Sequence, residues 1–432
     1  MESIAIIGTG IAGMGCGHFL HNEYELDFYE QNSYVGGHTN TVNVQEEGKE
    51  IPIDTGFIVF NNITYPNLVR LFTELKVEVK PTNMSFGVQY LPTGLEYNSL
   101  NLFAQKKNYF SISFWKMLFE IKRFYDEAEE VLTMEKYASY SLMDYAKEKN
   151  YSNAFIYKYV VPMSSALWST PTDITLQYPV RALVHFFKNH GMLGINAQFQ
   201  WYTVHNGSHQ YRDKLIAPFK NRIRLNQRVK RVIREGGKAK VMTADGSEKT
   251  YDKVIFACHA DQALRLIENP TALERRLLSP FDYQKNIATL HTDEAIMPKI
   301  QSTWSAWNYR VQEINGQLTS TTVYDMNRLQ QVSKNRNYFV SINDHGVIDQ
   351  SKVLRTIEYE HPIFTPATAK SQLELHQLNE NGVSFFCGSY FRFGFHEDAF
   401  TSAVQLCTRL LGRDPWREVT VKHSNPVSEL VS

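Results

Sequence analysis

Residues 3–13 read Ser-Ile-Ala-Ile-Ile-Gly-Thr-Gly-Ile-Ala-Gly, an apolar run that leads directly into three glycines spaced as Gly-x-Gly-x-x-Gly. Residues 26–30 read Leu-Asp-Phe-Tyr-Glu, a second apolar run that ends in an acidic residue, and a glycine pair follows at positions 36 and 37. This order predicts a strand, a glycine turn, a helix over residues 11–20 and a second strand. Such an arrangement is typical of a dinucleotide-binding βαβ unit.

Each glycine of the turn has a separate physical role. Gly8 allows the chain to leave the strand in a tight turn, and Gly10, which has no side chain, allows the backbone to approach a pyrophosphate. Gly13 allows the helix over residues 11–20 to pack closely on the sheet. The free amides at the start of that helix are expected to point at the phosphates. The Glu30 carboxylate is expected to accept hydrogen bonds from both hydroxyls of a ribose.

The composition argues against several classes of protein. The 432 residues are enough for two or three domain-sized units, and basic and acidic residues balance, so the chain lacks the positive charge of a nucleic-acid-binding protein. The four cysteines form no CxxC pair, so we expect neither a zinc site nor a disulfide framework. We expect no signal peptide, and no apolar run is long enough to span a membrane. A cytoplasmic protein is therefore predicted, with peripheral membrane contact left open.

The order of apolar patterns predicts an α/β fold with two interleaved domains. A discontinuous Rossmann-like domain is expected from residues 1–76, 205–277 and 375–425, because helix and strand patterns of the nucleotide-binding kind return twice. The intervening residues 77–204 and 278–374 are expected to form an α+β substrate-binding domain. Aromatic-rich strands in its second part predict an antiparallel sheet beside an apolar cavity.

One helical segment of the substrate-binding domain allows two interpretations. Residues 108–132 carry many aromatic and aliphatic side chains together with Lys116, Lys122 and Arg123. This pattern fits a helix that lies on a membrane surface, apolar on one side and basic on the other. It also fits an amphipathic helix whose apolar stripe packs inside the domain. Five acidic residues between positions 120 and 130 dilute the basic face and favour the second interpretation.

The glycine pair after the ribose acid resembles the flavoprotein form of the motif, in which the pair approaches the pyrophosphate of FAD. Those families usually carry arginine after the pair, whereas this chain has His38. Nearly the whole chain is similar to the flavin-containing amine oxidoreductase superfamily. Besides Gly8, Gly10, Gly13, Glu30 and the pair at 36–37, the motifs that carry this resemblance are Asp54-Thr-Gly56, Gly207-Ser208, Cys387-Gly388 and residues 394–402.

A bacterial branch of predicted NAD/FAD-binding proteins is more similar still. Its characteristic motifs occur here at residues 189–193, 290–293, 304–309, 324–327 and 394–398. That branch includes desaturases that act on methylated fatty acyl chains in furan fatty acid formation. The resemblance therefore implies a lipid-like substrate.

The resemblance implies noncovalent FAD. Members that bind flavin covalently use a cysteine upstream of the final glycine motif, whereas Cys387 lies inside that motif. A final helix over residues 399–411, entered through residues 395–398, is expected to face the flavin ring. The residues implied to bind the cofactor are Gly8, Gly10, Ile11, Ala12, Gly13, Glu30, Gln31, Gly36, Gly37, His38, Thr55, Gly56, Phe57, Val229, Gly388, Gly394, Phe395, His396 and Glu397.

The implied activity is that of an FAD-dependent oxidoreductase that desaturates a lipid or fatty acyl chain by hydride transfer to flavin N5. His190, His291 and His396 are candidates for a catalytic base, although each also fits a structural role. Lys285 is a candidate for the lysine that many amine oxidases place near N5. A flavin amine oxidase and a non-catalytic FAD-binding partner of a lipid-modifying enzyme are the alternatives. The electron acceptor and the oligomeric state stay open.

Overall fold

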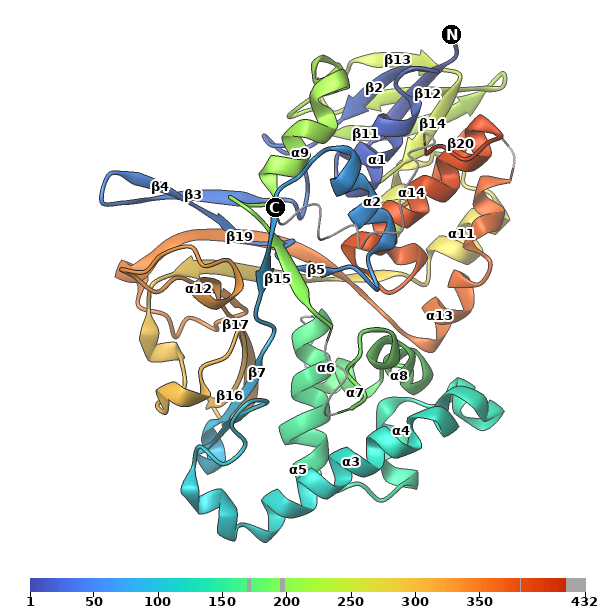
Figure 1. The fold of residues 1–432 in the computed structure, drawn as a ribbon. Coiled ribbons are helices and arrows are strands. Elements are labelled where there is room, and N and C mark those ends of the chain that lie inside the picture. The colour runs from blue at the N-terminus through green and yellow to red at the C-terminus, as the bar shows by residue number, and fades with distance from the viewer. Residues whose placement is uncertain (169–171, 195–198, 381, 417–432) are drawn as a thin grey trace.

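The computed structural model describes residues 1–168, 172–194, 199–380 and 382–416. A parallel sheet with its helices forms one end of the molecule, and a layer of helices forms the other end (Figure 1). A large, mainly antiparallel sheet lies alongside the helical layer, and its two longest strands run back towards the parallel sheet (Figure 1). The predicted combination of a parallel nucleotide-binding sheet with an antiparallel sheet is confirmed.

The parallel sheet is assembled from segments far apart in the chain. Its strand order is β10-β2-β1-β14-β20, and every neighbouring pair is parallel. The strands are β1 (Ser3–Ile7), β2 (Glu25–Tyr29), β10 (Ile223–Arg224), β14 (Lys253–Phe256) and β20 (Ser384–Phe386). The first, second and third of the predicted nucleotide-binding segments all contribute strands to this one sheet.

Two helices, α1 (Ile11–Leu20) and α14 (His396–Leu411), pack against each other beside this sheet. Glycines on α1 permit the close approach. A Cβ on Gly15 would lie 2.9 Å from the ring of Phe400, and a Cβ on Gly17 would lie 2.7 Å from Phe28 and Phe219. Because rings fill these positions, α1 tolerates no larger side chain there.

A second, three-stranded antiparallel sheet packs beside the parallel sheet. It consists of β11 (Val229–Glu235), β12 (Lys238–Thr243) and β13 (Glu248–Tyr251). Asp252 marks the division between the two sheets, since β13 ends at Tyr251 and β14 of the parallel sheet begins at Lys253. The Asp252 carboxylate accepts hydrogen bonds from the Ser3 amide and hydroxyl, both at 2.9 Å, and so ties the division to the start of β1.

The large sheet has the order β19-β15-β18-β17-β16-β7-β8. All neighbouring pairs are antiparallel except β16 and β7, which are parallel. Its strands are β7 (Phe86–Tyr90), β8 (Leu95–Asn98), β15 (Asp282–His291), β16 (Trp307–Ile314), β17 (Gln317–Asp325), β18 (Phe339–Ile342) and β19 (Val353–Ile363).

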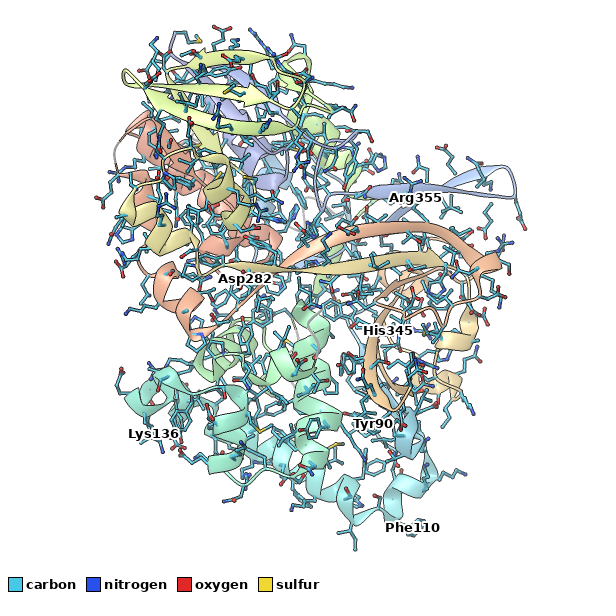
Figure 2. The ribbon with its side chains drawn as sticks, turned by 180° about the vertical axis from the view of Figure 1, so that it is seen from behind. Tyr90, Phe110, Lys136, Asp282, His345 and Arg355 are labelled. Carbon is cyan, nitrogen blue, oxygen red and sulfur yellow. The ribbon has the colours of Figure 1, made fainter. Side chains whose placement is uncertain are left out.

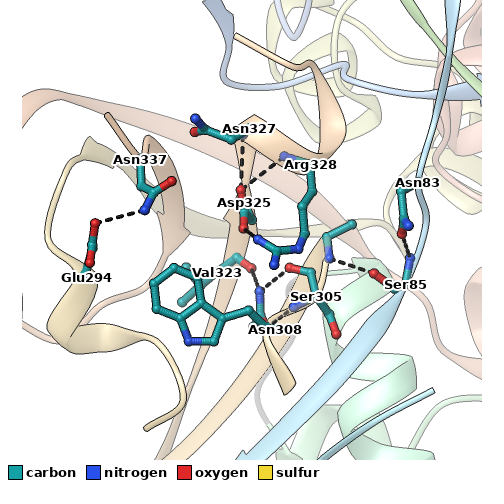
Figure 3. A network of polar contacts seen from close by, with 12 residues as sticks. Asn83, Ser85, Glu294, Ser305, Asn308, Val323, Asp325, Asn327, Arg328 and Asn337 are labelled. Atoms are coloured by element: carbon teal, nitrogen blue, oxygen red, sulfur yellow. Dashed lines mark hydrogen bonds and ion pairs between the residues drawn. The ribbon is translucent and has the colours of Figure 1, made fainter. Parts of the chain in front are cut away.

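Polar side chains from two of the sequence motifs hold this sheet together (Figure 3). The Asn308 amide group donates to the Ser305 carbonyl at 2.6 Å and to the Val323 carbonyl at 3.3 Å. Asp325 accepts hydrogen bonds from the amides of Asn327 and Arg328, both at 3.1 Å, and so begins the short helix α12 (Met326–Leu329). The motifs at residues 304–309 and 324–327 therefore have a structural role in the sheet.

The helical layer is built around a core rich in aromatic residues. The long helix α3 turns Phe114, Met117 and Phe124 into this core. None of the helices in the described part of the chain is long and apolar enough to cross a membrane. The layer contains α3 (Ile112–Thr133), α4 (Leu142–Glu148), α5 (Asn153–Phe155), α6 (Val161–Trp168), α7 (Thr172–Leu176) and α8 (Val180–Asn189), and a 3-10 turn (Lys106–Phe110) precedes α3.

The remaining elements connect these layers. Among them, β3 and β4 form a hairpin across Gly48. The connecting elements are β3 (Thr41–Glu46), β4 (Lys49–Asp54), β5 (Phe60–Asn61), α2 (Pro66–Glu74), β6 (Val79–Thr82), β9 (Trp201–Val204), α9 (His209–Ile216), α10 (Ala260–Leu266), α11 (Ala272–Leu278) and α13 (Pro366–Gln372).

Candidate functional site

One large cavity connects the parallel sheet with the helical layer. Its volume is about 1710 Å³, which exceeds the roughly 300–1,000 Å³ of ordinary ligand pockets. The turn after β1 lines one end, and the first half of α3 lines the other. The cavity therefore has room for a dinucleotide and a substrate in a single continuous space.

The glycine turn forms a cradle lined by backbone. Gly8 has a φ of +103°, and a Cβ on Gly13 would lie 2.1 Å from the Gly8 carbonyl oxygen. Gly10 has no such neighbour within 4 Å and faces the cavity. Gly37, with a φ of +57°, brings the second glycine segment to the opposite side of Gly10. Two stretches of bare backbone thus face the same part of the cavity.

Glu30 is held in position at this end of the cavity. One carboxylate oxygen accepts hydrogen bonds from the Thr9 amide at 3.1 Å and from the Thr9 hydroxyl at 2.6 Å. The other accepts a hydrogen bond from the Asn32 amide at 2.9 Å. The backbone amide of Gln227 donates to the Glu30 carbonyl at 2.8 Å, which brings Val229 beside this acid in the cavity wall.

His38, directly after the glycine pair, is a neutral residue in this structure. Burial lowers its pKa well below the usual range. Its ring stacks on Tyr359 at 4.7 Å, and its Nε2 lies 3.2 Å from Nε2 of His361. Burial also lowers the pKa of His361 to about 4. His38 therefore adds no positive charge where related flavoproteins place arginine.

The start of α14 lies at the centre of the cavity wall. The helix begins at His396, three residues earlier than expected, because the Asp398 carboxylate accepts a hydrogen bond from the Phe395 amide at 2.9 Å. His396 stacks on Phe57 at 4.0 Å, and its Nε2 lies 2.5 Å from the Tyr211 hydroxyl. Burial lowers the pKa of His396 to about 3, so its ring is neutral.

The sequence predicts that Glu397 binds the cofactor, but the structure places its carboxylate elsewhere. Its carboxylate accepts hydrogen bonds from the amides of Asn67 and Leu68 at 3.0 and 2.9 Å, at the start of α2. It does not belong to the described lining of the cavity. Because α2 needs an acceptor at its first free amides, Glu397 turns away from the cavity and caps that helix.

His190 is the predicted base that faces the apolar part of the cavity. Its ring stacks on Phe186 at 3.8 Å. Nδ1 lies 2.9 Å from the Phe186 carbonyl, so Nδ1 carries the hydrogen and Nε2 is the basic nitrogen. Burial lowers the pKa of His190 to about 4. No hydrogen bond to Nε2 is found within the described residues.

Two other candidates lie outside the cavity. Nδ1 of His291 accepts the Asp293 amide at 3.1 Å, while Nε2 lies 2.8 Å from the Ser341 hydroxyl. Lys285 is exposed and pairs with Glu358 at 3.0 Å. Both residues belong to β15 and, six positions apart, lie on the same face of that strand. β18 pairs only with residues 288–291, so it covers His291 and leaves Lys285 exposed. Neither position supports the predicted catalytic role.

The structure adds residues that sequence patterns did not identify. Arg228 lines the cavity beside Val229, and His259 lies 3.2 Å from Glu360 at the edge of the same cavity. Tyr211 connects His396 to Thr39. Arg228 precedes β11 and His259 follows β14, whereas Tyr211 lies on α9, so no common local signal marks these residues.

Comparison with known proteins identifies the family. A profile described as flavin containing amine oxidoreductase matches residues 17–296, more than half of the chain. The chain belongs to the flavin-containing amine oxidoreductase family. Within that family the protein is an FAD-dependent oxidoreductase. A search of curated proteins finds no match.

Solved structures show that the fold is shared. Cyclohexylamine oxidase from Brevibacterium oxydans IH-35A superposes with a TM-score of 0.68 at 14% identity, over 95% of this chain and 99% of that one. A fatty acid isomerase from P. acnes that produces CLA gives 0.67 at 14% identity, over 94% and 98%. Wild-type putrescine oxidase bound to putrescine gives 0.67 at 12% identity, over 95% and 99%. At these identities the likeness concerns the fold alone.

The residues of the cavity fit FAD. The space beside Gly10 and Gly37 suits a pyrophosphate. It is free because Gly10 has no side chain to fill it. Glu30, which is expected to bind the adenosine ribose, lies at the same end of the cavity as the first amides of α1, which are expected to bind the phosphates. Cys387 lies 3.7 Å from Cys16, sulfur to sulfur, and does not belong to the described lining of the cavity. Cys387 is therefore not placed to bond to a flavin, whereas Cys258 does line the cavity.

Replacing Glu30 with glutamine is expected to weaken FAD binding about tenfold or more, because a hydrogen bond to a charged group contributes roughly 1.5–3 kcal/mol. Glutamine also has a single acceptor oxygen, so either the two Thr9 donors or the Asn32 amide loses its acceptor. Titration of the apoprotein with FAD, followed by flavin fluorescence, measures the change. Glu25→Gln is the matched control, because Glu25 begins the strand that Glu30 directly follows but pairs with Arg222 at the surface. Equal dissociation constants for both variants would contradict this role of Glu30.

Asp398 makes the stability of the protein depend on pH. Burial raises its pKa from 3.8 to about 7. Between these values the unfolded chain has released the proton and the folded chain has kept it, so the free energy of unfolding decreases as pH rises. Asp398→Asn retains an acceptor for the Phe395 amide and removes this titration. The variant should therefore gain stability relative to the wild type from about pH 4 to about pH 7, measured by denaturant unfolding. Parallel pH curves for the two proteins would contradict the shift.

Proposed function

We propose that this FAD-dependent oxidoreductase dehydrogenates a lipid or fatty acyl chain and leaves a double bond, as do the desaturases of furan fatty acid formation. The observation that carries the proposal is the lining of the cavity on the side of α3. Most of the described side chains there are apolar or aromatic, with Ser99, Lys122 and His190 as polar exceptions, and they include Leu102, Phe103, Trp115, Leu118, Phe119, Ile121, Tyr125, Tyr159, Met163 and Met192.

The positions of the charged residues favour an acyl chain over an amine. Among the described carboxylates of the cavity lining, Glu30 directly follows β2, and Glu358 and Glu360 belong to β19, so none comes from the helical layer. A protonated amine in the apolar half would therefore lack a counter-ion, at a high desolvation cost. The solved structures that share this fold include two amine oxidases and a fatty acid isomerase, so fold likeness does not favour either substrate class.

His190 has the position and the tautomer of a proton acceptor. When bound, FAD supplies the acceptor for a hydride from one substrate carbon. The Nε2 of His190 takes the proton from the neighbouring carbon, and the electron pair left behind forms the double bond. Phe186 holds the imidazole ring by stacking and by its carbonyl oxygen. The apolar wall excludes water from the acyl chain.

Substrate reduction of the flavin tests the proposal. The holoenzyme is mixed anaerobically with dispersed acyl lipids or with a panel of amines, and flavin absorbance is followed. Bleaching by the lipids, with a product two hydrogens lighter by mass spectrometry, is expected. Bleaching by amines alone would make the protein an amine oxidase. If neither class bleaches the flavin while dithionite does, the protein is a non-catalytic FAD-binding partner and the proposal fails.

His190→Gln is expected to slow lipid-dependent bleaching about a hundredfold, because loss of a general base typically costs 10²–10⁴ in rate. Bound FAD should be unchanged. His185→Gln is the matched control, since His185 lies on the same helix but is exposed. Stopped-flow absorbance gives both rates. Similar rates for the two variants would remove His190 from the proposed reaction.

A further inference from the structure

We propose that an apolar tip, formed by Leu100, Tyr109, Phe110, Ile112, Trp115 and Phe119, inserts into the surface of an anionic lipid bilayer. The tip lies at the opposite end of the molecule from the nucleotide-binding sheet, as the position of Phe110 in Figure 2 shows. The docking itself does not depend on the activity proposed above. Direct entry of an acyl chain from the bilayer into the cavity does rest on it.

The exposure of these side chains is unusual for a protein surface. Phe110 is 90% exposed, Ile112 is 87% exposed and Phe119 is 68% exposed, and all three come from one short stretch of chain. Single exposed apolar residues are common, whereas neighbouring large ones mark interaction sites. The sequence allowed either a membrane-surface helix or a packed helix, and α3 has features of both. One side of α3 packs into the core, and the other side is exposed.

Side-chain contacts hold the residues of the tip in place. Tyr109 stacks on Phe103 with ring centres 4.3 Å apart, and the Trp115 indole donates to the Tyr109 carbonyl at 3.0 Å. Phe114 and Met117, between the exposed positions, are buried in the helical core. The Ser111 hydroxyl accepts the Phe114 amide at 3.2 Å and caps the start of α3. The outer side chains are thus held outward by the packing of their neighbours.

The charge around the tip is positive. Residues 97–119 contain Lys106, Lys107 and Lys116 and no acidic residue. All three lysines are exposed, and Lys107 donates to the Gly94 carbonyl at 3.0 Å. Apolar side chains surrounded by lysines match the acyl boundary and the anionic headgroups of a bilayer. In a symmetric dimer through the same surface, the lysines of the two copies would repel each other.

The cavity opens at the tip. Trp115 and Phe119 line the cavity and are also 40% and 68% exposed, so they belong to its mouth. Leu102 and Phe103 continue the lining inward. A bilayer on the tip would therefore cover the mouth, and an acyl chain would pass from lipid to the apolar half of the cavity without crossing water.

Co-sedimentation of the holoenzyme with vesicles tests the docking without turnover. Vesicles of phosphatidylcholine alone are compared with equimolar phosphatidylcholine and phosphatidylglycerol, and flavin absorbance in the pellet measures binding. Wild-type protein should bind the anionic vesicles, and less so at high salt. The variant F110S/I112S/F119S should bind about tenfold less. Its flavin content and thermal unfolding should match the wild type, because these side chains are outside the core.

Control variants make the outcomes decisive. L318S/L354S/L373S removes three exposed leucines elsewhere on the surface and should bind as the wild type does. K106E/K107E/K116E should lose the preference for anionic vesicles. No wild-type binding to either vesicle, equal binding by the tip variant, or a wild-type dimer that the tip substitutions convert to a monomer would each overturn the proposal. Failure of docking would leave flavin reduction by detergent-dispersed lipids intact, so the two proposals fail separately.

Discussion

Replacing Gly10 with valine is expected to abolish FAD binding while the protein still folds. Gly10 has an ordinary negative φ of −64°, and a Cβ at this position meets no atom within 4 Å, so the apoprotein accommodates the side chain. That same free space lies between the two glycine segments where the pyrophosphate is expected. Purified Gly10→Val should lack flavin absorbance and should not recover it on addition of FAD, while its circular dichroism matches the wild-type apoprotein.

Gly13→Ala is the variant to compare with Gly10→Val. Its Cβ would lie 2.1 Å from the backbone oxygen of Gly8, so the helix must move away from the sheet. We expect this variant to lose stability by about 1–3 kcal/mol or more, as overpacked cores do. Gly10→Val should instead unfold like the wild-type apoprotein. FAD binding by Gly10→Val with unchanged affinity would show that the cofactor does not pass between the two glycine segments.

Replacing Asp54 with alanine is expected to lower the free energy of unfolding by about 3 kcal/mol or more, because several buried donors lose their acceptor at once. The Asp54 carboxylate is fully buried. It accepts hydrogen bonds from the Ser208 amide at 2.9 Å, the Thr41 hydroxyl at 2.5 Å and the Gln330 side chain at 2.6 Å. These partners come from three distant parts of the chain. Denaturant unfolding of the purified apoprotein measures the loss.

Two further variants separate the hydrogen bonds of Asp54 from a general loss of charge. Asp54→Asn keeps one acceptor oxygen and the shape of the side chain, but it presents an amide to the Gln330 donor. Its stability should therefore lie between those of the wild type and Asp54→Ala. Asp282→Ala removes an exposed acid at the start of β15 and should change stability by no more than about 0.5 kcal/mol. Equal effects at positions 54 and 282 would contradict the role of Asp54.

Local patterns were sufficient for the nucleotide-binding half of the fold. The observed bounds of β1, α1 and β2 match the expectation because apolar periodicity and the glycine spacing act within thirty residues. Asp398 is a similar case, because it caps its own helix by accepting a hydrogen bond from the amide of Phe395, three residues earlier. Glu397 is the residue directly before Asp398, yet its carboxylate caps α2 and not its own helix. The sequence did not show this, because α2 lies more than three hundred residues earlier.

The pairing of β15 with its neighbouring strands determines where two of the catalytic candidates lie. His291 and Lys285 are six residues apart on one strand and share a face, and a residue type alone does not reveal which part of a strand its neighbours cover. The pairing of β15 with β18 and β19 sends Lys285 to solvent and places His291 between strands. His190 lies on a helix, and the packing of α8 turns it towards the cavity.

The sequence by itself determined the cofactor end of this protein. A glycine turn, a helix and an acidic residue are close in the chain, so their relative positions follow from backbone geometry. Only the tertiary structure decided the substrate end, which takes its wall from α3, α8 and the large sheet. Those elements meet through side-chain packing across hundreds of residues, as do His38 with His361 and Tyr211 with His396. Periodicity shows that such residues are buried, whereas tertiary packing selects their neighbours.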